Sequence, residues 1–84
     1  MASIKHSGGA AWVVDIHEMD AADAKRHLER LLSNAPPGAQ ELVVIHGCHG
    51  GHALRDMVRR TLKHKRIARR ILSMNDGETT LLLQ

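Results

Sequence analysis

The sequence predicts an α/β domain whose strands and helices follow one another in the order βαβαββ. Short aliphatic runs of strand length alternate with two segments in which apolar residues recur at helical spacing. Strands that are joined by a helix run parallel, so the carboxyl ends of the first two strands should meet at one edge of the sheet. Ligands of open α/β sheets bind at that edge, and we expect a functional site there.

The composition indicates one small domain with an aliphatic core. The chain has 84 residues, and a chain of this size buries only about 60% of the surface that it exposes when unfolded. It contains no Phe or Tyr, one Trp and one Cys, so an internal disulfide is excluded. Together with the absence of a signal-peptide pattern, this favours a cytoplasmic protein. No apolar run is long enough to cross a membrane, and the oligomeric state is left open.

The first half of the chain predicts an arm, a strand and a helix. Residues 1–9 are expected to form a flexible arm, because a Ser-Gly-Gly run disfavours regular structure, and residues 10–84 a single domain. The first strand begins at Ala10 with the run AAWVVDIH. Asp20 is the expected N-cap of the first helix. That helix covers about residues 21–34 and buries a stripe of Ala and Leu side chains.

The second half supplies another strand, another helix and a hairpin. A Pro-Pro-Gly run ends the first helix, because proline lacks the amide hydrogen that a helix needs. An aliphatic strand then leads through a glycine-rich loop into the second helix, and the closing hairpin turns at Asn-Asp-Gly. The expected ranges are 41–45 for the strand, 52–64 for the helix, and 66–73 and 79–83 for the hairpin strands.

The glycine-rich loop after residue 45 predicts an anion-binding site. Gly47, Gly50 and Gly51 let the backbone come close to a phosphate, and the first amide groups of the following helix have no partner within that helix. Arg55 lies in the first helical turn, where a cation is unfavourable unless an anion binds nearby. The simpler alternative for such a loop is a turn without a ligand.

Polar side chains follow both of the first two strands. Asp15 and His17 end the first strand, and His46 follows the second. A histidine with a pKa near neutrality can accept a proton from a nucleophile, and a carboxylate beside it favours its charged form. Asp15, His17 and His46 are therefore the candidate catalytic residues. Two histidines acting as base and acid would give a bell-shaped dependence of the rate on pH.

Basic residues are concentrated in one block. The whole chain has a formal net charge of +3, but residues 55–70 hold eight basic residues and a single acidic one. Helix faces that are merely solvated usually carry both signs, so this block indicates binding to nucleic acid. The cations expected to meet phosphates are Arg55, Arg59, Lys63 and Arg66.

Three segments of the chain resemble, in order and spacing, the three motifs of the small MutS-related (Smr) domain family. These segments are DIH at 15–17, IHG through ALR at 45–55, and GETTLLL at 77–83, beside the family patterns LDLHG, HGxGxGxLR and GxTxVxL. The resemblance implies a two-layer α/β sandwich with a four-stranded mixed sheet, similar to the C-terminal domain of translation initiation factor three. It also implies nucleic-acid binding and, for many members, endonuclease activity on DNA or RNA, including messenger RNA on stalled ribosomes.

The residues that match these motifs were already selected above from the strand ends and from the glycine-rich loop. In the first two motifs they include Asp15, His17, His46, Gly47, Gly50, Gly51 and Arg55. Two departures are present, since Glu18 replaces the usual glycine after the first histidine and the second loop is one residue longer than the family pattern. The sequence thus leaves two hypotheses, an endonuclease or a non-catalytic module that binds nucleic acid or the ribosome.

A metal site is the remaining alternative for the glycine-rich loop. His46, His49 and His52 recur at every third position beside Cys48. This spacing matches no standard zinc pattern, so no metal ligand and no cofactor are predicted. The choice between DNA and RNA, and the use of Mg²⁺ in cleavage, are left open.

Overall fold

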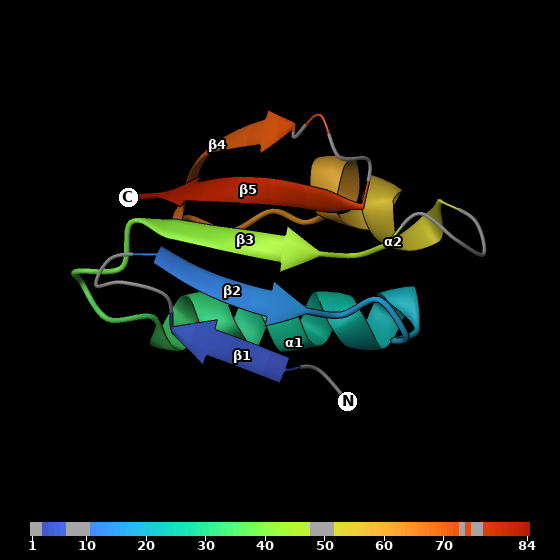
Figure 1. Ribbon diagram of the computed structural model, residues 1–84. Helices are drawn as coiled ribbons and strands as arrows, with labels where there is room; N and C mark the ends of the chain where they lie inside the picture. Colours follow the sequence, from blue (N-terminus) through green and yellow to red (C-terminus); the bar gives the residue numbers. More distant parts are fainter. Residues whose placement is uncertain (1–2, 7–10, 48–51, 73, 75–76) are drawn as a thin grey trace.

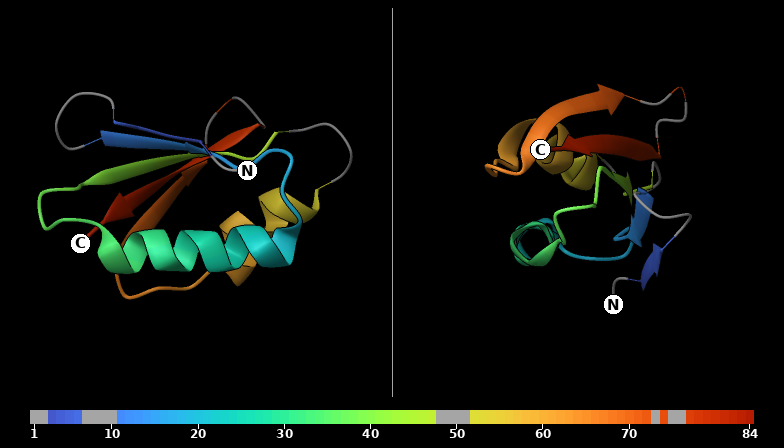
Figure 2. Two further views of the ribbon diagram at one scale, coloured as in Figure 1. Left: turned by 90° about the horizontal axis from the view of Figure 1, so that it is seen from below. Right: turned by 90° about the vertical axis from the view of Figure 1, so that its left-hand side faces the viewer.

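A mixed sheet forms one layer of this computed structural model and two helical segments form the other, as Figures 1 and 2 show. The structure describes residues 3–6, 11–47, 52–72, 74 and 77–84. Within them the sheet has five strands in the spatial order β1-β2-β3-β5-β4. Only β2 and β3 pair in parallel, and the other neighbours are antiparallel. The strands are β1 (Ser3–His6), β2 (Ala11–Asp15), β3 (Glu41–Ile45), β4 (Ile67–Leu72) and β5 (Glu78–Leu83).

Both helical segments cover the same face of the sheet (Figure 2). Helix α1 (Ala21–Asn34) has the predicted bounds, and the Asp20 side chain caps it by accepting a hydrogen bond from Ala22 N. Helix α2 (Ala53–Asp56) continues directly into the π-helical turn η1 (Met57–Thr61). The second helix therefore ends three residues before the predicted position 64.

The sheet contains one strand more than the sequence predicted. The expected four strands form β2, β3, β4 and β5, each bounded within two residues of the predicted range. The fifth, β1, lies in the segment expected to be a flexible arm, and it pairs with β2 so that Ser3 is opposite Asp15 and His6 is opposite Trp12. An edge strand such as β1 is held by main-chain hydrogen bonds to its neighbour. The pattern of apolar side chains in the sequence therefore does not predict it. Of the predicted turn, residues 75 and 76 lie outside the described ranges.

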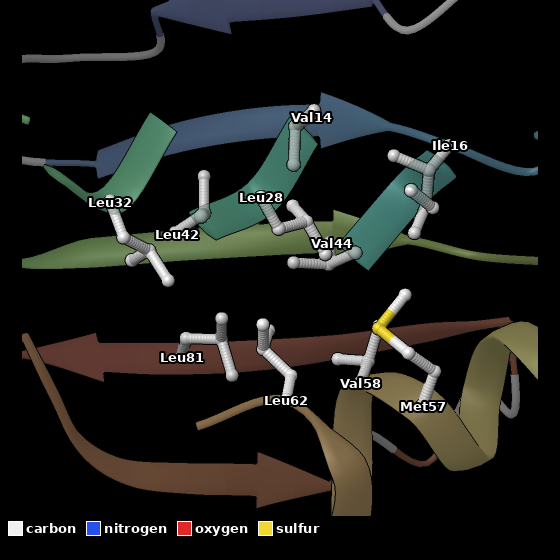
Figure 3. Packing of buried hydrophobic residues seen from close by; sticks show 11 residues of the cluster. Val14, Ile16, Leu28, Leu32, Leu42, Val44, Met57, Val58, Leu62 and Leu81 are labelled. Carbon is white, nitrogen blue, oxygen red and sulfur yellow. The ribbon is translucent and has the colours of Figure 1, made fainter. Parts of the chain in front are cut away.

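Aliphatic side chains from both layers form the core (Figure 3). In β3 and β5 alternate residues are buried against the helices, as the two-residue period of a strand requires. On α1 the buried residues recur at intervals of four, which places them on one side of that helix. The buried cluster consists of Val14, Ile16, Ala24, Leu28, Leu32, Leu42, Val44, Met57, Val58, Leu62 and Leu81. No helix among the described residues is long and apolar enough to span a membrane.

Two cations of the basic block hold the ends of the helices in place. Arg66 donates to the carbonyl oxygens of Ala35 (2.9 Å) and Pro36 (3.3 Å), just after α1. Arg70 donates to Val58 O (2.9 Å) and to Leu62 O, at the end of η1. The two guanidinium groups thus donate to carbonyl groups in and just beyond the last turns of the helical segments.

The hydrogen bonds of Arg66 predict a loss of stability when its guanidinium is removed. Arg66→Gln should lower the free energy of unfolding by about 1–3 kcal/mol, because hydrogen bonds from a charged donor to half-buried carbonyls would be lost. Urea denaturation measures the change. Lys65→Gln removes the same charge from the exposed neighbouring side chain and should stay within about 0.5 kcal/mol of the wild type. Equal effects of the two variants would contradict a structural role for Arg66.

Candidate functional site

Asp15 and His17 form a hydrogen-bonded pair where β2 ends. The backbone N–H of Ile16 donates to Ile45 O (2.9 Å), and the Ile16 side chain is buried in the core. Its two neighbours therefore point away from the core. His17 Nδ1 lies 2.5 Å from Asp15 Oδ1, and the same oxygen accepts from His17 N at 3.0 Å. The carboxylate holds the Nδ1 proton, which makes Nε2 the basic nitrogen of the neutral ring.

The imidazole of His17 is accessible and its pKa is raised. Half of the side chain is exposed (51%), as is about a third of Asp15 (36%). The hydrogen bond that His17 donates to Asp15, and then the negative charge of Asp15, raise the pKa of His17 above the ordinary value of 6.5. Glu18 adds to this effect, since its Oε1 lies 3.6 Å from His17 Nε2 and its side chain is 81% exposed.

Gly47 turns the chain directly against this pair. Its φ of +79° lies in the left-handed region, which a side chain disfavours. The N–H groups of His46 and Gly47 both donate to Gly77 O, at 2.9 and 2.8 Å, and so tie the turn to the start of β5. A Cβ placed on Gly47 would lie 3.2 Å from His17 Cβ. The predicted glycine turn is therefore in contact with the predicted catalytic pair.

His46 lies in the core, whereas the sequence placed it in the cleft with His17. Its residue is only 3% exposed. The ring is hydrogen-bonded to Gly47 O through Nδ1 (3.1 Å) and to Thr79 Oγ1 through Nε2 (2.9 Å). Burial lowers the pKa of His46, and the positive charges of Arg59 and Arg55 lower it further. The hydrogen bond to Gly47 O and the charge of Glu78 oppose this shift.

Thr79 is a site residue whose role the residue pattern did not assign. It is fully buried, and its Oγ1 contacts both His46 Nε2 (2.9 Å) and Arg59 Nε (2.8 Å), from which it accepts a hydrogen bond. Arg59 Nη2 also donates to Glu78 O (3.3 Å). A signal was present in the sequence, because Thr79 shares its strand face with the buried Leu81. A polar side chain at a core position requires a hydrogen-bond partner.

The predicted phosphate-binding residues occupy different parts of the structure. Arg55 lies near His46, with its Nε 3.7 Å from Asp56 Oδ1, and Lys63 is exposed. Arg66 lies at the other end of the sheet, where its O accepts from Gln84 N. Gly50 and Gly51 lie outside the described residues. The cations of the block that are exposed are Arg60, Lys63, Lys65 and Arg69.

Carboxylate and imidazole groups at this edge offer few ligands for a metal ion. Among the residues with described positions, no group of three or more His, Cys, Asp or Glu side chains is arranged to hold one. Cys48 and His49 of the glycine-rich loop are not among those residues. Asp15 and Glu18 supply oxygen atoms of the kind that Mg²⁺ prefers, so a bound Mg²⁺ would need water or substrate to complete its shell.

The three-motif pattern and the site geometry agree with the comparison to known proteins. Residues 14–80 match the family model of the Smr domain. The chain belongs to the Smr domain family. This Smr domain is also similar to the crystal structure of the Smr domain of Thermus thermophilus MutS2, with a TM-score of 0.75 and 27% sequence identity. The similarity covers 86% of this chain and 96% of that one. A search of curated proteins gave no match.

Family membership confirms the resemblance and the α/β fold that were inferred from the three motifs. In this Smr domain each motif contributes to the same edge of the sheet. The first provides Asp15 and His17, and the second provides Gly47. The third provides Gly77, whose carbonyl holds the Gly47 turn. Three segments that are far apart in the sequence are thus joined by direct contacts.

The backbone of Gly47 predicts that this position does not tolerate a side chain. Gly47→Ala should cost about 1–2 kcal/mol of unfolding free energy, because an L-residue is strained in the left-handed region. Gly47→Val should cost more, since its branched side chain meets His17. Chemical denaturation measures both.

Gly38 provides the control for these variants. Its φ is not in the strained range and a Cβ there would meet nothing within 4 Å, so Gly38→Ala should be neutral or slightly stabilising. If Gly47→Ala proves as harmless as Gly38→Ala, the turn does not depend on glycine.

Proposed function

We propose that this domain binds nucleic acid across the edge where β2 and β3 end, and that it cleaves a phosphodiester bond there with His17 as the proton-transfer group. The observation that carries the proposal is the Asp15–His17 pair. It combines a half-exposed imidazole, a carboxylate on Nδ1 and a contact with the Gly47 turn. Membership of the Smr family, which is known for nucleic-acid binding and nuclease-like domains, supports it.

Charge supports the binding half of the proposal. The formal net charge is +3, and Arg60, Lys63 and Lys65 of η1 and the segment after it are exposed. Arg55 is placed to compensate a phosphate near His46, and Lys63 is free to reach the backbone of a bound strand. Contacts of this kind bind the phosphate backbone without reading the base sequence.

Proton transfer through His17 supports the catalytic half. In the neutral ring Nε2 accepts a proton from the attacking group, which is water or a ribose 2′-hydroxyl, while the attacking oxygen bonds to phosphorus and the bond to the leaving oxygen breaks. Asp15 stabilises the imidazolium that forms. The leaving oxygen takes its proton from solvent. We assign no proton transfer to His46, because its ring is buried and both of its nitrogens are hydrogen-bonded.

Glu18 favours the second candidate, a module that binds nucleic acid or the ribosome without cleaving it. Its exposed carboxylate lies 3.6 Å from His17 Nε2, where it stabilises the charged imidazolium in the resting state and repels an approaching phosphate. A protein that binds but does not turn over would follow from this arrangement. The two candidates share one binding surface, so cleavage assays distinguish them.

Binding should weaken steeply with salt. If about four phosphates of a single strand are neutralised, the logarithm of the binding constant should fall with the logarithm of salt concentration at a slope of about −3. Replacing the exposed Lys63 by Gln should make that slope shallower by about 0.7. Fluorescence anisotropy with a labelled single-stranded oligonucleotide measures both. Arg66→Gln is the matched control and should keep the wild-type slope, since its guanidinium already bonds to backbone carbonyls. A wild-type slope near zero would refute electrostatic binding.

Cleavage should depend on His17 in its neutral form. The rate should therefore rise with pH and level off above the pKa of His17, which Asp15 holds above 6.5. His17→Ala should lower the rate about 10²-fold or more and leave affinity within a few fold. Asp15→Asn should move the midpoint of the pH profile downward, because the charge that raises the pKa is gone.

The matched control for these variants is His27→Gln, on helix α1, which should cleave as the wild type does. Assays on labelled single-stranded RNA and duplex DNA, with and without EDTA, identify the substrate and any need for Mg²⁺. If the wild type binds these substrates and cleaves none, the non-catalytic candidate replaces the enzyme. If His17→Ala cleaves normally, His17 is not the proton-transfer group.

A further inference from the structure

We propose that Arg59 and Thr79 are positioning residues of this site, which fix the orientation of the His46 ring and, through it, the Gly47 turn against which His17 packs. For its effect on cleavage the inference rests on the proposed function, but its structural part stands alone. It gives Arg59 a role other than the phosphate binding that the basic block suggested.

The direction of each hydrogen bond in this chain of contacts follows from the groups at its two ends. Gly47 O can only accept, so His46 Nδ1 carries a proton and donates. Arg59 Nε can only donate, so Thr79 Oγ1 accepts from it at 2.8 Å. The hydroxyl proton of Thr79 is then directed at His46 Nε2, 2.9 Å away, which accepts as the unprotonated nitrogen of a neutral ring. In this arrangement each hydrogen bond from Arg59 through Thr79 and His46 to Gly47 O joins one donor to one acceptor.

Arg59 makes this arrangement independent of pH. A guanidinium stays protonated at every pH that a protein experiences, so Arg59 Nε always donates its hydrogen bond to Thr79 Oγ1. A second bond from Arg59 to Glu78 O holds the guanidinium on β5. Thr79 is fully buried, so water does not replace either partner.

Burial lowers the pKa of His46 and so favours the neutral ring, and the positive charges of Arg59 and Arg55 add to this effect. The hydrogen bond to Gly47 O and the charge of Glu78 act in the opposite direction. The π-helical turn contributes by placing Arg59 toward β5. That turn is closed by the bond from Leu62 N to Met57 O at 2.7 Å, five residues back along the chain.

Gly47 connects the buried hydrogen bonds of Arg59, Thr79 and His46 to the exposed Asp15–His17 pair. Its carbonyl accepts from His46 Nδ1, and its amide donates to Gly77 O at 2.8 Å. Both sides of the residue are thus tied to buried groups. A Cβ on Gly47 would lie 3.2 Å from His17 Cβ, so movement of the turn moves His17. The geometry makes His46 a support for the catalytic pair.

Two variants of Thr79 test the inference. Thr79→Val keeps the shape of the side chain but removes the hydroxyl, and Thr79→Ser keeps the hydroxyl. In the wild type, ¹⁵N-detected imidazole spectra should show His46 as a single neutral Nδ1–H form at pH 7 to 8. Thr79→Val should lose that single form, and Thr79→Ser should retain it. A wild-type His46 that carries its proton on Nε2, or that titrates near 6.5, would overturn the inference whether or not the domain binds nucleic acid.

Salt dependence separates positioning from phosphate contact. Arg59→Gln should keep the wild-type slope of binding against salt, whereas Lys63→Gln makes it shallower by about 0.7. If Arg59→Gln changes the slope as much as Lys63→Gln does, Arg59 is a phosphate ligand and the inference is wrong.

Cleavage kinetics provide the third measurement. Thr79→Val should lower kcat about ten- to a hundred-fold with KM little changed, as expected for a misplaced catalytic group, and Thr79→Ser should restore most of the rate. The midpoint of the pH profile should stay at the wild-type value, because the Asp15–His17 pair is intact. A shifted midpoint in Thr79→Val would mean that His46 itself titrates in the reaction, which contradicts a positioning role.

Discussion

Parallel pairing of β2 with β3 is the interaction on which the candidate site depends. The register sets Asp15 opposite Ile45, and Ile16 N–H extends the pairing one residue beyond β2. Both chains therefore leave the sheet at the same level, which brings His17 and the Gly47 turn into contact. An antiparallel arrangement of the same two strands would separate them by the length of the sheet. The crossover through α1, packed on the sheet by its buried leucines, makes the parallel pairing possible.

Side-chain periodicity predicted those parts of the fold whose side chains face a buried layer. It located α1 and β3 at their observed bounds and β2, β4 and β5 closely, because burial imposes the same spacing that the sequence displays. It did not reveal β1, since an edge strand is held by main-chain bonds. Nor did it reveal the π-helical turn η1, whose wider spacing differs from that of an α-helix.

The candidate site was predictable where chemistry follows from neighbours in the sequence. Asp15 and His17 are two residues apart beyond a strand, and their pairing follows from that position. The burial of His46 was also encoded, because it shares a strand face with Leu42 and Val44. The hydrogen-bond partners of Arg59, Arg66 and Arg70 could not be predicted from local sequence patterns, since each guanidinium binds a group in another segment of the chain. A run of positive charge in a sequence therefore overstates the charge that a partner molecule meets.

Strand β5 follows β4 in the chain but lies between β3 and β4 in the sheet. It also brings Gly77 and Thr79, which hold the Gly47 turn and His46. During synthesis from the amino end, β1, β2, α1 and β3 can assemble while one edge of β3 stays unpaired, and only the last strand to emerge can cover it. The site is completed in the same step. A nascent chain that is still short of β5 would thus lack both the partner of β3 and the residues that hold the Gly47 turn and His46.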